Sequence, residues 1–442
     1  MKKMETRAII CLTLVAVLVA GMLLFVFRFV SDGGKWATFY GNQTLYTDGH
    51  LNRGAIYDRN DQVLIKNTSD DVIYNEDPSV RKGTLHVVGD LDGNIGTGAL
   101  SVFRDKIIGY NLLTGTYSWK KDAGDIKLTI DGLTSKVAYE AMAGRKGLVG
   151  VYNYKTGEIL TMVSTPTYDP LYPGDIKNDP PSGLYLNKVL SAKMTPGSIF
   201  KLVTSAAAIE NLSDVENFSY DCDGEYIVGG EKIRCPYAHG HVNFETALAK
   251  SCNGAFAKLS EKLGPTIMTD YVKKLDLEKE FNINGVHNIR GSFQFPKDNP
   301  LELGWAGIGQ YKDLINPMSM LVYMGAIAGD GKAVEPVLLK SAISFTSYTD
   351  QLIQPETAKK LQAMMKNNVE MTYGEHNFPD LDIYAKSGTA EVGNGSNGWF
   401  AGFIKNPDAP YAFIVCVEGG ADGARTAGPV ANKVLQQLVN SN

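Results

Sequence analysis

The most informative stretch of this chain is Thr195-Pro196-Gly197-Ser198-Ile199-Phe200-Lys201. Proline and glycine break the chain just before the serine, and the apolar pattern that follows predicts a helix over residues 199–209. Ser198 therefore lies at the predicted helix N-terminus, where free N–H groups stabilise a developing negative charge. Lys201 lies one turn further along the same helical face. This spacing predicts a serine nucleophile next to a lysine amine.

Two further polar motifs follow in the sequence, Ser251-Cys252-Asn253 and Lys386-Ser387-Gly388-Thr389. The first precedes a predicted helix over residues 254–263, and its serine and asparagine are suited to proton relay and to recognition of a substrate amide. The second follows a strand-like segment, residues 381–385, and precedes a glycine-rich loop over residues 393–398. Lys386 and Thr389 are suited to binding a terminal carboxylate, and Gly388 lets a ligand backbone approach the strand edge.

Together these residue types supply serine acyl transfer without histidine. A serine hydroxyl needs a base to take its proton, and a lysine is that base only when burial and a second cation lower its pKa. Lys386 is the candidate second cation, and the N–H groups of Ser198 and Thr389 are the candidate oxyanion hole. The chemistry requires no cofactor and no catalytic metal. We predict that the catalytic residues are Ser198, Lys201, Ser251, Asn253 and Lys386, and that the substrate-binding residues are Ser387, Gly388 and Thr389.

Three other stretches match parts of these motifs: Ser79 with Lys82, Ser118 with Lys121, and Lys155-Thr156-Gly157. A single match of this kind is most often a solvated turn or helix surface. No apolar periodicity follows Ser79, and Ser118 precedes a turn at residues 122–125. The third match lies between two alternating, β-rich runs, which predicts a hairpin turn. Order and local setting therefore favour Ser198 and Lys386 as the site.

The composition indicates a large folded protein that does not bind nucleic acid. The chain has 442 residues, of which 44% are hydrophobic, so it is long enough to bury at least one large core. The net charge is −5, and the sequence has no basic cluster.

An uncharged, mostly apolar run over residues 8–27 is long enough to span a bilayer. Lys2, Lys3 and Arg7 precede this run, which predicts a cytoplasmic N-terminus and an extracytoplasmic position for everything after Arg28. The competing interpretation is a cleaved signal peptide. An uncleaved anchor is favoured because the run is longer than a typical signal core and residues 28–31 offer no small-residue cleavage site.

The pattern of the whole chain predicts an α/β (α+β) fold. We expect a cytoplasmic tail over residues 1–7, a transmembrane anchor over 8–30, a juxtamembrane linker over 31–50, a small β-rich N-terminal module over 51–128 and a catalytic domain over 129–442. Strand patterns near residues 148–163 and 398–418, with helical patterns around them, predict a central antiparallel sheet flanked by helices, with a mostly helical lobe between its parts.

Cys222 and Cys235 bracket a glycine-rich hairpin and allow two interpretations. Outside the membrane they are able to form a disulfide, or they remain free thiols. Together with His239, and with His241 or Cys252 as a further ligand, they are able instead to bind a structural zinc ion that the acyl chemistry does not need.

The ordered set of motifs resembles that of the penicillin-binding proteins and serine β-lactamases. Residues 52–60, Asn52-Arg53-Gly54-Ala55-Ile56-Tyr57-Asp58-Arg59-Asn60, resemble the RGxIxDRNG segment of class B penicillin-binding proteins. The resemblance covers residues 50–440 and implies a class B-like protein whose residues 129–442 form a penicillin-binding transpeptidase domain of the β-lactamase/transpeptidase-like fold. Further stretches that fit the family are residues 156–170, 307–310, 316–317 and 399–403.

The chain departs from the class B pattern in two places. Class B proteins usually hold a long pedestal domain between anchor and catalytic domain, and the stretch available here is short, so a docking or dimerisation role of the pedestal is not carried over. Tyr311 stands where the family's GQG motif has its second glycine.

By this resemblance, the chain is a membrane-anchored peptidoglycan D,D-transpeptidase. It would form an acyl-enzyme on Ser198 from a D-Ala-D-Ala stem peptide and cross-link it to a neighbouring amine, and penicillin would acylate the same serine. The alternatives are a D,D-carboxypeptidase or β-lactamase, with water as acceptor, and a β-lactam-binding sensor without turnover. The single anchor and the RGxIxDRNG-like segment favour the transpeptidase. Glu302 is a candidate carboxylate for activating water.

The implied partners are peptidoglycan stem peptides, β-lactam antibiotics, the lipid bilayer around the N-terminal helix and a polytopic glycan polymerase. The implied location is the bacterial cell membrane, with a single span and an extracytoplasmic catalytic domain. The acceptor, the growth stage and the oligomeric state stay open at this level.

Overall fold

The computed structural model describes residues 2–38, 46–47, 50–51, 54–68, 71–110, 124–177, 180–341, 346–393 and 395–441. Asn52 and Arg53 of the RGxIxDRNG-like segment, and the match at Ser118 and Lys121, lie outside these residues. The chain divides into two compact units. The first consists of Met1–Ile56, Ile65–Ile73 and Phe103–Ile126, and the second of Tyr57–Leu64, Tyr74–Val102 and Lys127–Asn442.

The first unit begins with α1 (Lys2–Ala37), a helix that is long and apolar enough to cross a membrane. The side chains of its apolar run are exposed, as a lipid-facing helix requires. The helix continues through residues 31–37, which the sequence pattern assigned to a linker. Short elements of both units follow between residues 46 and 127, and of these α2 (Pro78–Val88) and α3 (Ala99–Val102) belong to the second unit. The others are β1 (Tyr46–Thr47), β2 (His50–Leu51), β3 (Gly54–Tyr57), β4 (Val63–Asn67), β5 (Val72–Tyr74), α4 (Arg104–Ile107) and β6 (Ile126–Lys127).

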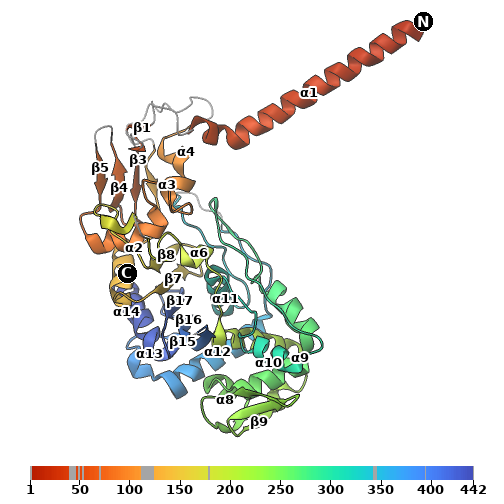
Figure 1. The fold of residues 1–442 in the computed structure, drawn as a ribbon, viewed down its shortest axis with the longest axis vertical. Coiled ribbons are helices and arrows are strands. Elements are labelled where there is room, and N and C mark those ends of the chain that lie inside the picture. Colours follow the sequence, from red (N-terminus) through yellow and green to blue (C-terminus); the bar gives the residue numbers. More distant parts are fainter. Residues whose placement is uncertain are drawn as a thin grey trace. The chain divides into compact units, whose positions relative to one another are not determined.

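The second unit is built on a five-stranded antiparallel sheet with the order β15-β16-β17-β7-β8 (Figure 1). This confirms the predicted central sheet, and Lys155-Thr156-Gly157 connects β7 to β8 as predicted. β15 is an edge strand of this sheet, so among the described residues only one of its two edges pairs with another strand, β16. The strands are β7 (Gly147–Asn153), β8 (Ile159–Thr165), β15 (Ile383–Val392), β16 (Gly395–Ile404) and β17 (Tyr411–Glu418).

Helices cover both faces of this sheet. Successive side chains of a strand point to opposite faces, so β7 contributes to two cores. On one face Val149 and Val151 pack with α5 (Gly132–Met142) and α14 (Gly428–Asn440). On the other face the ring of Tyr152 lies against α11 (Pro317–Ala328) at Gly325, where a Cβ would come within 1.7 Å of the tyrosine oxygen.

A mostly helical lobe lies in the sequence between β8 and β15, as predicted. Its longest helix, α9, is interrupted at Gly264 (φ 74°) and Pro265, so the predicted helix over residues 254–263 matches its first segment. The helical elements are η1 (Gly174–Lys177), α6 (Lys188–Ser191), η2 (Gly197–Phe200), α7 (Lys201–Asn211), η3 (Val215–Asn217), α8 (Phe244–Ala249), α9 (Asn253–Lys274), α10 (Pro300–Gly307), α11, α12 (Pro355–Asn368), η4 (Val369–Tyr373) and η5 (Glu375–Asn377).

Small hairpins interrupt the helical lobe. Between α7 and α8, β9 (Ser219–Cys222) pairs with β12 (Gly240–Asn243), and β10 (Glu225–Val228) pairs with β11 (Glu231–Arg234). We call residues 219–243 the hairpin region. The other short elements of this unit are β13 (Asn282–Ile283), β14 (Val286–His287) and α13 (Gly423–Thr426).

Candidate active site

Ser198 lies in the 3-10 turn η2, which leads directly into α7. The predicted helical run over residues 199–209 is present, with its first turn tightened. Gly197 has φ 55°, and a Cβ there would lie 2.6 Å from the carbonyl oxygen of Thr389. Glycine is required at this position because the turn that carries the serine packs directly against β15.

Lys201 is completely buried and joins the first two motifs. Its Nζ lies 3.0 Å from Ser198 Oγ and 3.1 Å from Ser251 Oγ, and it donates to Ser251 O and Asn253 Oδ1, each at 2.7 Å. Burial lowers the pKa of Lys201 to about 7, while electrostatic interactions with Cys252 and Cys235 act in the opposite direction. A large fraction of the amine is therefore neutral near pH 7 and able to accept a proton.

Lys386 is also completely buried and shares the Ser251 hydroxyl with Lys201. Its Nζ lies 3.2 Å from Ser251 Oγ and donates to Ser387 O at 2.8 Å. Burial first, and the charge of Lys201 second, hold the pKa of Lys386 well below its usual value. The sequence predicted that burial and the charge of Lys386 would together lower the pKa of Lys201; burial is the lowering cause in the structure. Because repulsion between two buried amines is mutual, the pair favours states with at most one ammonium.

Ser251 and Asn253 lie in the turn that begins α9. Ser251 has φ 54°, a left-handed conformation that is unfavourable by about 1 kcal/mol or more for a residue other than glycine. Asn253 accepts from Lys201, and its Nδ2 donates to the carbonyl oxygen of Arg234 at 2.8 Å. The surrounding contacts therefore hold this motif in a strained conformation that presents its hydroxyl to both lysines.

Ser387, Gly388 and Thr389 lie inside β15, which is longer than the predicted strand over residues 381–385. β16 begins at Gly395, so most of the predicted glycine-rich loop is strand. Alternation along β15 leaves Ser387 and Thr389 accessible while Gly388 is buried. A Cβ at Gly388 would lie 3.1 Å from Ile199 N, which explains why glycine stands where β15 meets the turn of Ser198.

One cavity of about 260 Å³ brings together the serine, the second motif and the accessible edge of β15. It includes residues that the motif analysis missed, notably Trp305, Glu391 and Asp422. In a strand that continues through the motif, Glu391 lies on the same face as Ser387 and Thr389. A longer predicted strand would therefore have identified Glu391 as a site residue. The lining residues are Ser198, Pro236, Lys250, Ser251, Asn253, Trp305, Ile308, Gln310, Ser387, Gly388, Thr389, Glu391 and Asp422.

Carboxylates reach this cavity from positions other than the one expected. Glu302, the predicted candidate for activating water, lies in the first turn of α10 and is not among the residues that line the cavity. Glu391 and Asp422 line it instead. Asp422 is the N-cap of α13 and accepts from Ala424 N at 2.9 Å, so its carboxylate is already oriented by the backbone.

Tyr311, the departure from the family pattern, has φ 61°. Glycine adopts this conformation without strain, which explains why the family pattern has glycine here. Gly309, two residues earlier, has φ 76°, and a Cβ there would lie 2.2 Å from the carbonyl oxygen of Gly197. Positions 309 and 311 therefore both have a positive φ. Only at Gly309 does close packing also exclude a Cβ.

The match at Ser79 and Lys82 lies in α2, a helix that the sequence pattern did not predict. Lys82 Nζ lies over the ring of Tyr139, 5.8 Å from its centroid. The Ser79 backbone N–H donates to the Asp77 side chain, which caps α2. These contacts are those of an ordinary helix start, so this match is a structural feature of α2 and not a second serine–lysine site.

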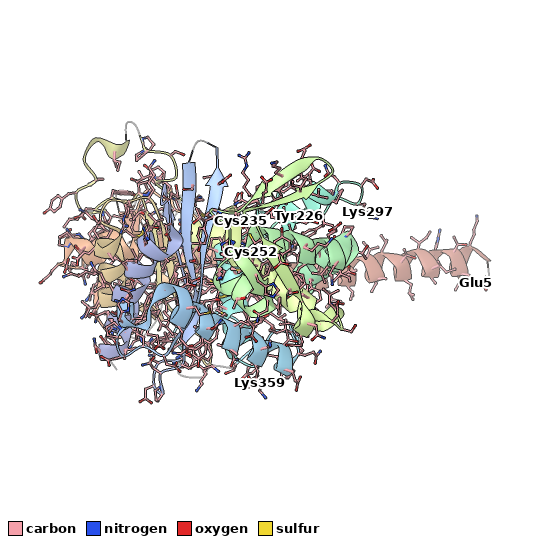
Figure 2. All side chains as sticks on the ribbon, turned by 90° about the horizontal axis from the view of Figure 1, so that it is seen from below. Glu5, Tyr226, Cys235, Cys252, Lys297 and Lys359 are labelled. Carbon is pink, nitrogen blue, oxygen red and sulfur yellow. The ribbon has the colours of Figure 1, made fainter. Side chains whose placement is uncertain are left out.

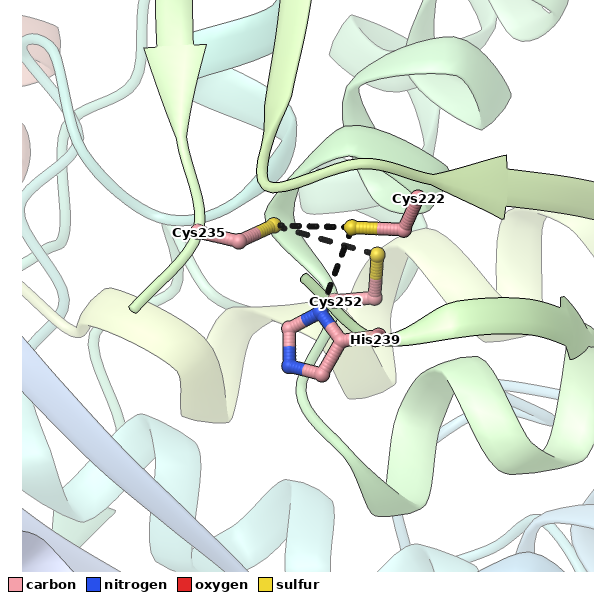
Figure 3. Close-up of side chains that lie close together, drawn as sticks. All are labelled: Cys222, Cys235, His239 and Cys252. Atoms are coloured by element: carbon pink, nitrogen blue, oxygen red, sulfur yellow. Dashed lines mark hydrogen bonds between the residues drawn. The ribbon is translucent and has the colours of Figure 1, made fainter. Parts of the chain in front are cut away.

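Four potential metal ligands gather beside the second motif, Cys222, Cys235, His239 and Cys252 (Figure 3). All their ligand atoms lie within 4.8 Å of one another. The cysteines are free, and the 3.7 Å between the sulfur atoms of Cys222 and Cys235 exceeds a disulfide bond of about 2 Å, so the disulfide alternative is not what the structure has. Figure 2 shows Cys235 close to Cys252, the middle residue of the second motif.

His241, the other histidine named as a ligand, takes no part in this cluster. Its Nδ1 lies 2.7 Å from Asp221 Oδ1, and both side chains are exposed. Cys252 is therefore the fourth member of the group.

A serine at a helix start, a buried lysine 3.0 Å from its hydroxyl and a second buried lysine on an adjoining sheet edge define a serine acyl-transfer enzyme that works without histidine. Residues 147–438 match the family described as the penicillin binding protein transpeptidase domain. The chain belongs to this family, which confirms the resemblance found in its motifs.

Known proteins are similar to this chain in sequence. The chain is 27% identical over 373 residues to the peptidoglycan D,D-transpeptidase PbpA of Mycolicibacterium smegmatis, covering 71% of this chain and 72% of that one. It is 26% identical to the stage V sporulation protein D of Bacillus subtilis, covering 74% of this chain and 54% of that protein.

Solved structures agree on the fold. The D,D-transpeptidase domain of a peptidoglycan glycosyltransferase from Eggerthella lenta superposes with a TM-score of 0.75 at 24% identity, covering 88% of this chain and 98% of that one. A ceftriaxone acyl-enzyme complex of penicillin-binding protein A from M. tuberculosis gives a TM-score of 0.73 at 22% identity, covering 87% and 97%.

Proposed function

We propose that the chain is a membrane-anchored peptidoglycan D,D-transpeptidase in which Ser198 is the acylated residue. The observation that carries the assignment is the 3.0 Å contact between Ser198 Oγ and Lys201 Nζ, in a buried setting that lowers the pKa of the lysine to about 7. Relatives named as peptidoglycan D,D-transpeptidases support the same reaction. Penicillin acylates the same serine.

The residues divide the acylation step as follows. Neutral Lys201 takes the proton of Ser198, and Oγ bonds to the carbonyl carbon of the penultimate D-alanine. The N–H groups of Ser198 and Thr389 hold the oxyanion, and Thr389, on the accessible edge of β15, holds the terminal carboxylate, with buried Lys386 behind that edge. The bond to the last D-alanine then breaks, and the leaving amine receives a proton that passes from Lys201 through Ser251.

The second step transfers the acyl group from Ser198 to an amine of a neighbouring stem peptide. The acceptor amine attacks the ester carbonyl, gives its proton back to the lysine, and Ser198 leaves with a proton. Glu391 and Asp422 line the cavity. They keep hydrolysis, with a carboxylate orienting water, as the second candidate.

The proposed membrane orientation of the enzyme rests on the residues of α1. Lys2, Lys3 and Arg7 before the apolar run favour a cytoplasmic N-terminus and a catalytic part outside the membrane. The proposed boundaries are a tail over residues 1–7, an anchor over 8–30, a linker over 31–50, a small module over 51–128 and the transpeptidase domain over 129–442. A polytopic glycan polymerase contacting the anchor is the proposed partner.

The same chain binds a structural zinc ion through Cys222, Cys235 and His239. Thiolate and imidazole are the ligands that structural zinc prefers, and three buried or half-buried groups of this kind lie within one ligand sphere. Zinc takes no part in bond making at Ser198.

Replacing the nucleophile tests the proposed function. In Ser198→Ala we expect complete loss of covalent labelling by fluorescent penicillin at an unchanged melting temperature. Persistent labelling of this variant would show that another residue is acylated.

The acceptor needs a separate measurement. Incubation of the full chain with a pentapeptide and an amine, followed by separation of the cross-linked and hydrolysed products, distinguishes amine from water. Cross-linked product is expected, and rapid hydrolysis alone would favour the carboxypeptidase.

A further inference from the structure

We propose that η4, a single π-helical turn, is a clamp that holds the second motif, Ser251-Cys252-Asn253, at a fixed distance from the third, Lys386-Ser387-Gly388-Thr389. Thr372 and Tyr373 are the two positioning residues of this clamp. The inference rests on the acyl transfer proposed above and concerns how the polar groups of that site are held in place. Neither residue is among those that line the cavity, so both act through other residues.

Thr372 completes the end of α8, the helix that leads into the second motif. A helix leaves its last carbonyl groups without partners inside the helix. Backbone N–H groups of residues 250–252 satisfy the carbonyl groups of residues 246–248. Thr372 Oγ1 donates to the next carbonyl, Ala249 O, at 3.0 Å. This bond lies two residues before Ser251, so it connects η4 to the turn that presents the Ser251 hydroxyl.

Tyr373 contacts the outer edge of β15, which is the edge opposite β16. Ser387 N donates to Tyr373 Oη at 2.8 Å. The buried tyrosine ring packs against Phe400 of β16, with 5.4 Å between the ring centroids. In an antiparallel strand the N–H groups of alternate residues point to the same edge, so the N–H of Thr389 points to the edge that Tyr373 contacts. The tyrosine therefore fixes the strand edge that carries a proposed oxyanion donor.

The π-helical form of η4 lets neighbouring residues bind the two motifs. Gly374 N donates to Val369 O at 2.8 Å, and Gly374 has φ 78°, which glycine adopts without strain. Successive residues of a helical turn point in different directions, so one hydroxyl reaches α8 while the next reaches β15. At the end of α12, which packs against β15 (Figure 1), Asn368 Nδ2 donates to Ala385 O at 2.9 Å. The turn is therefore bonded to the strand at its start and at its end.

The contact that this clamp maintains is the one between Lys386 and Ser251. Ser251 Oγ lies 3.2 Å from Lys386 Nζ and 3.1 Å from Lys201 Nζ. The two motifs belong to separate elements, so contacts outside the cavity contribute to their spacing. Because a displacement of about 1 Å is enough to slow a reaction about 100-fold, loss of either hydroxyl of the clamp should slow acylation without removing a group that touches penicillin.

Variants of Thr372 in the full chain, in detergent, give the first test. Thr372→Val keeps the shape of the side chain and removes the hydroxyl, so the maximal acylation rate constant for fluorescent penicillin should fall at least about 10-fold. The half-saturating penicillin concentration should change little, because this bond acts on the turn of Ser251 and on proton transfer there. Thr372→Ser keeps the hydroxyl and should restore most of the rate. An unchanged rate constant in Thr372→Val would overturn the proposal.

Tyr373→Phe gives the second test. It should lower the rate constant by a similar factor and also raise the half-saturating concentration, because β15 binds the terminal carboxylate as well. Tyr154→Phe is the matched control, since Tyr154 is also buried and its hydroxyl donates to Ile404 O at 3.3 Å, away from the cavity. The control should show a similar fall in melting temperature and keep its acylation rate. Equal slowing of both variants would assign the effect to stability and refute the positioning role.

The double variant Thr372→Val/Tyr373→Phe distinguishes a clamp from two separate contacts. If one turn holds both motifs, breaking either bond releases them, so the double variant should be about as slow as the slower single variant. Independent contacts would instead multiply two effects of about 10-fold to about 100-fold, and that result would refute the clamp.

Failure of the clamp and failure of the serine assignment give different results. If the clamp is wrong, Thr372→Val and Tyr373→Phe are labelled at the rate of the unmodified chain, while Ser198→Ala stays unlabelled. If the serine assignment is wrong, Ser198→Ala is labelled, and the rates of the two η4 variants still decide whether the clamp exists.

Discussion

The pKa of Lys201 is set by the residues around it. An exposed lysine is an ammonium ion at neutral pH. Lys201 has no exposed surface, and burial lowers its pKa to about 7. Its contacts with Ser198, Ser251 and Asn253 keep the amine at the serine hydroxyl once the proton is lost. At the residue scale, the low pKa and the geometry together suit the lysine to its proposed role as the base.

This pKa has a direct consequence for the pH dependence of acylation. Below the pKa, Lys201 is protonated and has no lone pair for the serine proton; above it, the lone pair is free. We expect the acylation rate constant for fluorescent penicillin to rise with pH through about 7 and to level off above about pH 8.

The matched variant is Lys201→Arg, whose guanidinium stays protonated and should lose labelling at every pH. A rate constant of the unmodified chain that is flat from about pH 5.5 to pH 8 would contradict the role of Lys201 as base.

At the scale of elements, the site depends on the contact between η2 and β15. Gly197 and Gly388 lie on the two sides of this contact; Gly197 has no room for a Cβ beside the carbonyl oxygen of Thr389, and a Cβ at Gly388 would be tight, 3.1 Å from Ile199 N. The contact brings the turn of Ser198 against Thr389. Close approach of a turn to a strand end, which only small residues permit, thus sets the geometry of the predicted oxyanion hole.

We therefore expect Gly197→Ala to lower the acylation rate at least about 10-fold, because the new methyl group would push β15 away from the turn of Ser198. Gly393→Ala is the control. Gly393 has a similar φ of 50°, but a Cβ there would meet nothing within 4 Å.

The control should share the backbone strain, about 1 kcal/mol of stability, and keep its acylation rate. Equal loss of labelling in both variants would show that strain matters here and close packing does not.

At the scale of the whole molecule, the chain combines an apolar helix with a catalytic unit whose face carries the polar motifs. The apolar side chains of α1 are exposed, which is unfavourable in water and favourable in lipid. Positive charges before the helix set the proposed orientation.

This orientation predicts the outcome of protease treatment of intact spheroplasts. External protease should degrade the catalytic unit and abolish labelling by a membrane-impermeant fluorescent penicillin, while a cytoplasmic marker protein stays intact. Protection of the catalytic unit under these conditions, with degradation after lysis, would reverse the orientation.

Much of the fold and site was predictable because the responsible patterns are local. Serine and lysine three residues apart at a helix start, an alternating run before Lys386 and a hairpin around Lys155 are each recognised over a few residues. The strand bounds were less accurate, since β15 extends through its motif by pairing with β16.

Other features arise only when distant segments meet. The common contact of Lys201 and Lys386 with Ser251, the carboxylates of Glu391 and Asp422 in the cavity, and the choice of Cys252 over His241 join residues far apart in the sequence. Local pattern sets the residue types and the elements of this protein, because helix and strand periodicities depend on neighbours in the chain. Tertiary packing decides pKa, site geometry and metal ligands, because burial and distance depend on segments that sequence spacing does not relate.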